Sequence, residues 1–67
     1  MLTKRSFSLS GHRTSVALED AFWDALAGLA QTRAASLAAL VAEIDADRPA
    51  EQPLASALRV YALLHKS

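Results

Sequence analysis

The stretch that decides the fold is residues 11–26, which read GHRTSVALEDAFWDAL. In its first half, apolar and polar side chains alternate: Thr14, Val16 and Leu18 share one side of an extended chain, and the residues between them share the other. Such alternation is typical of a strand that is buried on one side only. The pattern predicts a strand over residues 13–18.

A helix is expected to follow this strand without a linker. Glu19 and Asp20 place two carboxylates at its start, where the helix dipole stabilises negative charge. Beyond them, apolar side chains recur at the helical period in a stripe formed by Phe22, Leu26, Leu29 and Ala30. The change of period predicts a helix over residues 19–33.

The segment before the strand alternates as well. Phe7 and Leu9 are separated by serines, which indicates a strand or an extended arm over residues 5–9. A short connection containing Gly11 suggests a hairpin, although a kinked arm would have the same sequence pattern. We expect His12 to be a turn residue.

Two more helices are indicated in the second half of the chain. Ser36 is a favourable N-cap, and the apolar residues after it have helical spacing, being Leu37, Leu40, Val41 and Ile44. They predict a helix over residues 37–47. Pro53 suits the first turn of a third helix over residues 54–65, which is apolar around much of its circumference and is therefore expected at an interface.

Chain length points to oligomerisation. The sequence has 67 residues, so we expect one domain over residues 1–67, and a domain this small buries a low fraction of its surface. The apolar residues include fifteen alanines, which contribute little area each, and the absence of cysteine excludes disulfides. We expect a homodimer to supply the missing core.

Charge is unevenly distributed, although the formal net charge is zero. Residues 1–18 carry three basic and no acidic side chains, whereas residues 19–67 carry four basic and seven acidic ones. No apolar run has the length of a membrane span or a signal peptide, so we expect a cytoplasmic protein without membrane contact.

Nothing in the sequence indicates catalysis. There is no glycine-rich phosphate loop and no nucleophile elbow, and His12 and His65 are far apart with no cysteine to join them as metal ligands. We expect no enzyme activity, no cofactor and no metal site.

Three segments in the same order resemble a known family: residues 11–26, residues 36–41 (SLAALV) and residues 56–60 (SALRV). Together they are similar to the ribbon-helix-helix family of Arc and MetJ type, and to a subgroup of short stand-alone bacterial proteins within it. The resemblance implies a mostly α fold with a short β-ribbon and an intertwined homodimer. The third helix is an addition to the family's minimal fold, and we assign it to the dimer core. It also implies that the strand pairs antiparallel with its twofold mate, and that this ribbon enters the major groove of double-stranded DNA in transcription regulation.

The resemblance implies residue roles too. Base contacts are carried over onto Arg13, Ser15 and Ala17, of which Arg13 and Ser15 can form hydrogen bonds through their side chains. Phosphate contacts fall on Ser36 and Leu37 at the amino end of the second helix, and on Lys4 and Arg5 in the basic segment. The expected dimer core consists of Val16, Leu18, Phe22, Leu26, Leu40, Ile44, Leu58 and Tyr61.

Other interpretations remain open at this point. Arg13 could be an ordinary solvated strand arginine. The neutral net charge, together with an alanine at position 17, favours a protein-interaction dimer, such as an antitoxin-like adaptor, whose third helix or amino-terminal strand binds another protein. A non-specific architectural DNA binder fits less well, because the chain carries seven acidic residues.

Overall fold

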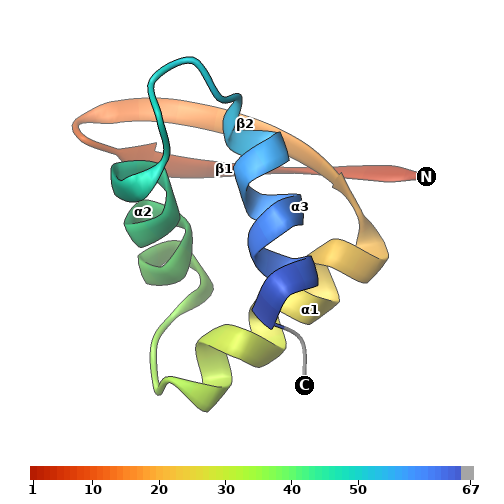
Figure 1. Ribbon diagram of the computed structural model, residues 1–67. Helices are drawn as coiled ribbons and strands as arrows, with labels where there is room; N and C mark the ends of the chain where they lie inside the picture. Colours follow the sequence, from red (N-terminus) through yellow and green to blue (C-terminus); the bar gives the residue numbers. More distant parts are fainter. Residues whose placement is uncertain (66–67) are drawn as a thin grey trace.

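The computed structural model describes residues 1–65, so the last two residues of the domain expected over 1–67 lie outside the described residues. A hairpin lies over a layer of three helices (Figure 1). The chain order is β1 (Leu2–Leu9), β2 (His12–Glu19), α1 (Asp20–Thr32), α2 (Leu37–Asp47) and α3 (Leu54–His65). This is the expected mostly α architecture with a short β-ribbon and an additional carboxyl-terminal helix.

The hairpin is complete within one chain. Strands β1 and β2 pair antiparallel from Leu2 opposite Glu19 to Leu9 opposite His12. Two residues with positive φ, Ser10 at 51° and Gly11 at 80°, connect them, as a two-residue hairpin turn of the favoured hand requires.

Two sequence predictions about this hairpin were wrong. The first strand begins at Leu2 rather than Arg5, because the residues before Arg5 pair with the last residues of β2. His12 is the first residue of β2 and not a turn residue, since Ser10 and Gly11 close the turn by themselves.

The helix ends follow from local capping. Glu19 has extended backbone angles and is the N-cap of α1, so that α1 begins one residue later than expected, and Arg33 caps its other end. Ser36 is the N-cap of α2, and its hydroxyl accepts a hydrogen bond of 3.0 Å from the N–H of Ala39. Helices α2 and α3 have the bounds given above.

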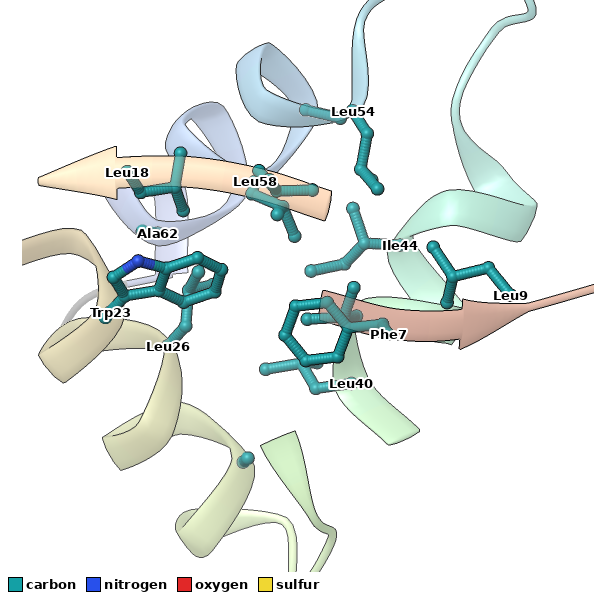
Figure 2. Packing of buried hydrophobic residues seen from close by; sticks show 14 residues of the cluster. Phe7, Leu9, Leu18, Trp23, Leu26, Leu40, Ile44, Leu54, Leu58 and Ala62 are labelled. Atoms are coloured by element: carbon teal, nitrogen blue, oxygen red, sulfur yellow. The ribbon is translucent and has the colours of Figure 1, made fainter. Parts of the chain in front are cut away.

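A single hydrophobic core joins the two layers (Figure 2). Both strands and all three helices contribute to it, and its members are Phe7, Leu9, Val16, Leu18, Trp23, Leu26, Ala30, Leu40, Val41, Ile44, Leu54, Ala57, Leu58 and Ala62. None of the buried side chains in residues 1–65 is polar. The hairpin therefore buries the apolar side chains of its inner face in the core of its own chain, whereas Arg5 and His12 on the same face are exposed.

This core changes the interpretation of the residues that were assigned to a dimer core. Within one chain, six of those eight side chains are already buried: Val16, Leu18, Leu26, Leu40, Ile44 and Leu58. Phe22 and Tyr61 are half-buried at its margin. Their burial within one chain results from β1, which lies beside β2, and from α3, which packs against β2.

Trp23 is the largest buried side chain, and it corrects the stripe expected for α1. The buried positions of α1 are Trp23, Leu26 and Ala30, whereas Phe22 and Leu29 are only half-buried. The indole Nε1 of Trp23 donates a hydrogen bond of 2.7 Å to the carbonyl oxygen of Thr3, and its ring centroid lies 5.9 Å from that of Phe7. A tryptophan can be buried here because β1 supplies an acceptor for its N–H.

Gly28 gives a first testable prediction. It lies in α1, is exposed, and a Cβ added to it would meet nothing within 4 Å. We expect Gly28→Ala to raise the free energy of unfolding by about 0.5–1 kcal/mol, because alanine loses less backbone entropy in a helix. Urea unfolding measures this. Gly11→Ala is the contrasting variant, since the positive φ of Gly11 makes the same substitution unfavourable there; a loss of stability in Gly28→Ala would contradict the prediction.

Candidate nucleic-acid interface

One side of the hairpin points away from the helices. Side chains alternate along each strand, so the positions between the buried ones form a continuous surface, which we call the outward face. It consists of Leu2, Lys4, Ser6 and Ser8 on β1 and Arg13, Ser15, Ala17 and Glu19 on β2. All three residues assigned to base reading, Arg13, Ser15 and Ala17, lie on it.

The register brings residues of the two strands together across the outward face. Ser6 lies opposite Ser15, with 2.9 Å between their hydroxyl oxygens. Ser8 lies opposite Arg13, and the guanidinium Nη1 of Arg13 donates to the Ser8 hydroxyl at 3.4 Å. Arg13 and Ser15, the two base-reading candidates whose side chains can form hydrogen bonds, are therefore each bonded to a serine of β1.

The charge of the outward face is positive over most of its length. From residue 3 to residue 18 the chain contains no acidic residue, and the face carries Lys4 and Arg13. These two cations are separated by four positions along the ladder, about 13 Å at the rise of a strand.

The carboxylate of Glu19, at the end of the outward face, forms an ion pair with a side chain of the helix layer. Arg59 of α3 donates from Nε to Glu19 at 3.1 Å. A hydrogen bond from the backbone of Glu19 itself and the Arg59 guanidinium lower the pKa of this carboxyl. Its negative charge is thus partly offset within the helix layer instead of opposing an anion at the hairpin.

Lys4 and Arg5 were both assigned to phosphate contacts, but they lie on opposite sides of β1. Lys4 belongs to the outward face, but Arg5 lies opposite Val16 on the side of the helices. Its guanidinium carbon is 5.4 Å from the ring centroid of Trp23. Arg5 is therefore not part of the outward face.

Ser36 and Leu37 are also separate from the outward face. Both lie at the amino end of α2, which points away from the hairpin (Figure 1). The N-cap bond to Ala39 uses one of the free N–H groups there, and helix geometry leaves those of the first two residues without an intrahelical partner. Within one chain, this end does not share a surface with Lys4 and Arg13.

A second exposed surface lies on α3. Val60, Leu63 and Leu64 are 44%, 62% and 72% exposed, and we call them the α3 apolar face. Beside them is an open pocket of about 200 Å³ between α2 and α3, whose lining includes Val60, Leu64, Tyr61 and His65. This surface differs from the outward face in both chemistry and position.

Sequence reasoning assigned no role to Ser6 and Ser8. The alternation with Phe7 and Leu9 placed them on the exposed side of their strand, which was the available signal. Their register with Ser15 and Arg13 was not available, because the length and turn of the hairpin were undecided.

Comparison with known proteins agrees with this architecture. A family model described as "Ribbon-helix-helix domain" matches residues 2–66, nearly the whole chain. No curated protein and no solved structure matches the chain. Among the described residues, no single helix is long and apolar enough to cross a membrane. Helices α1 and α2 together would have the length and apolar composition, but they are bent by 98° at the break between them.

Domains of this family are regulatory DNA-binding domains rather than enzymes, and they generally bind DNA as dimers in transcription regulation. Both strands, the strand-to-helix junction and the Ser-capped α2 fall within the matched residues. The chain therefore belongs to the ribbon-helix-helix domain family.

Proposed function

We propose that this protein is a DNA-binding transcriptional regulator whose hairpin enters the major groove with the outward face toward the bases. The observation that carries the proposal is the composition of this face: two cations, three serines and one alanine between residues 3 and 18, with no acidic side chain. The major groove admits a two-stranded β-ribbon, so such a surface can approach base edges without repelling the phosphates.

The three residues of β2 that were assigned to base reading have distinct tasks in the proposal. Arg13 donates two hydrogen bonds to O6 and N7 of a guanine, and Ser15 donates to or accepts from a neighbouring base edge. Ala17 provides an apolar contact for a thymine methyl group. Arg13 can therefore reach a base with its long side chain, whereas the short side chains of Ser15 and Ala17 reach one only when the strand backbone comes close to the floor of the groove.

Phosphate contacts in the proposal come chiefly from Lys4, which shares the outward face. Ser36 and Leu37 form a separate anion-binding site at the amino end of α2. The phosphates that they bind are not those beside the hairpin of the same chain; they belong to another stretch of DNA or to the DNA bound by a partner subunit. Because the lysine contact releases a counterion, DNA affinity falls as the salt concentration rises.

The regulator acts as a homodimer in this proposal, with the α3 apolar face as the contact between copies. The three residues are exposed by 44–72%, and an apolar face on a short helix gains stability when a second copy covers it. This contact leaves the hairpin free, since α3 lies in the opposite layer.

Leu64→Lys tests this contact. We expect it to raise the dimer dissociation constant about tenfold or more, because a charge then replaces an apolar side chain in the interface. Analytical ultracentrifugation gives the constant. Ala27→Lys, at an exposed position of α1, adds the same charge elsewhere and should leave the constant unchanged. Equal dimerisation of both variants would exclude the α3 apolar face as the contact.

The function itself is tested by selecting DNA. A pool of random double-stranded sequences is bound to the protein at about physiological salt, and the retained DNA is sequenced. We expect a defined sequence to be enriched by the wild type and lost with Arg13→Ala. Arg33→Ala, which removes an exposed cation of the helix layer that pairs with Glu43 and not with the outward face, is the matched control and should retain the enrichment.

The α3 apolar face also favours a second candidate function, that of an adaptor dimer binding another protein. Its exposed leucines suit a protein partner as well as a second copy. No sequence enrichment by the wild type, together with a stoichiometric protein partner lost in Leu64→Lys, would establish this alternative.

A further inference from the structure

We infer that β1 is a second reading strand: Ser6 and Ser8 contact DNA bases, and the ribbon of one chain reads a site that lacks twofold symmetry. The inference rests on the proposed function and assigns to it residues and a symmetry that family membership does not supply. The family resemblance implies, by contrast, a ribbon of two identical strands, one from each subunit.

The first step is the completeness of the hairpin. Its eight residue pairs run from Leu2 opposite Glu19 to the two-residue turn, and the apolar side chains of its inner face are buried in the core of the same chain. A two-stranded ribbon of the width that the major groove admits is therefore present before any second subunit binds. When β2 enters the groove, β1 enters beside it.

The second step is the size of the side chains that β1 presents. Between its two cations, the outward face carries only Ser6, Ser8, Ser15 and Ala17. Solvent-exposed strands are commonly protected by long charged side chains, which would hold a ligand away from the backbone. Here the side chains in the middle of both strands are short, so the bases can approach the backbone of β1 as closely as that of β2.

The third step is the pairing of hydroxyl groups. The Ser6 and Ser15 oxygens are 2.9 Å apart, and Ser8 accepts from Arg13 at 3.4 Å. A serine hydroxyl has one donor and two acceptor positions, so each serine can keep its cross-strand partner and still bond a base edge. Ser8 thus holds Arg13 while retaining a free acceptor toward the groove.

The fourth step concerns symmetry. A ribbon of two identical strands has a twofold axis at its centre, and operators mirror the symmetry of the protein that binds them. In this hairpin Lys4 lies opposite Ala17, and Ser8 lies opposite Arg13. Since the two strands differ, the sequence read by one ribbon is not a palindrome, and a dimer recognises two separate copies of it.

The test compares base preferences between variants of the whole chain. Wild type, Ser6→Ala/Ser8→Ala, Ser15→Ala, Arg13→Ala and the control Arg33→Ala are each used in the DNA selection, and affinities for the enriched site are measured. We expect Ser6→Ala/Ser8→Ala to weaken binding about five- to tenfold, as the loss of hydrogen bonds does. We also expect it to relax preference at a base that Ser15→Ala and Arg13→Ala leave unchanged.

The outcomes distinguish a failure of this inference from a failure of the proposed function. If the serine pair only positions Arg13 and Ser15, Ser6→Ala/Ser8→Ala relaxes the same bases as their variants do, and the inference fails. It fails too if the wild-type site is a palindrome centred on one ribbon, or if the double variant binds as the wild type does while Arg13→Ala does not. No enrichment by the wild type overturns the proposed function itself. The serines are exposed, so thermal unfolding of the double variant should match that of the wild type.

Discussion

Trp23→Ala is expected to lower the free energy of unfolding by about 3–5 kcal/mol, the usual cost of removing a buried tryptophan. The side chain is 2% exposed and contacts Phe7, so that its removal leaves a cavity between α1 and the hairpin. The carbonyl oxygen of Thr3 also loses the indole N–H that binds it. A domain of this size has a total stability of about 3–10 kcal/mol, so the variant should be largely unfolded at 37 °C.

Urea unfolding followed by circular dichroism measures the effect. Trp23→Phe is the matched control, because it keeps most of the apolar volume but removes the hydrogen bond to Thr3. We expect it to lie between the wild type and Trp23→Ala. A loss of less than about 1 kcal/mol in Trp23→Ala would mean that the hairpin does not depend on this contact.

Arg13→Glu is expected to weaken binding to the selected DNA about 100-fold or more. The variant loses a guanine contact that is worth about 1–3 kcal/mol and places a carboxylate in a groove lined by phosphates. Folding should be unaffected, because Arg13 is exposed and its hydrogen bond to Ser8 is long. Fluorescence anisotropy at several salt concentrations gives the affinity and its salt dependence.

Two controls make this result specific. Arg13→Lys keeps the charge but cannot form both guanine bonds in one plane, so we expect it to retain salt-dependent binding and lose base preference. Arg33→Ala removes a cation that pairs with Glu43 in the helix layer and should bind nearly as the wild type does. Unchanged binding by Arg13→Glu would show that DNA does not contact the outward face.

Much of the fold could be predicted from local sequence patterns. The alternation of Thr14, Val16 and Leu18 and the change of period at Glu19 predicted the strand-to-helix junction within one residue. Ser36 was identified as an N-cap, and its hydroxyl bonds Ala39. These features depend on residues within one or two turns of each other, which is why the sequence alone reveals them.

The side of β2 that faces away from the core was predictable for the same reason. Alternation is strict in a strand, so assigning Val16 and Leu18 to the core assigned Arg13, Ser15 and Ala17 to the other side. The same rule separates Arg5 from Lys4 and places Ser6 and Ser8 outward. The prediction treated the basic segment as a unit and did not apply the alternation there.

The sequence by itself determined the bounds of β2 and of the three helices to within one residue, and which side chains of β2 are exposed. Only the tertiary structure decided what pairs with β2, because the edge of a strand has the same backbone donors and acceptors for its own chain as for a second copy. It also decided that Trp23 rather than Phe22 is central, since the acceptor for the indole is the carbonyl of Thr3, twenty residues away. Contacts over such distances leave no periodic pattern in the sequence, and they decide which strand pairs with β2 and which aromatic side chain lies at the centre of the core.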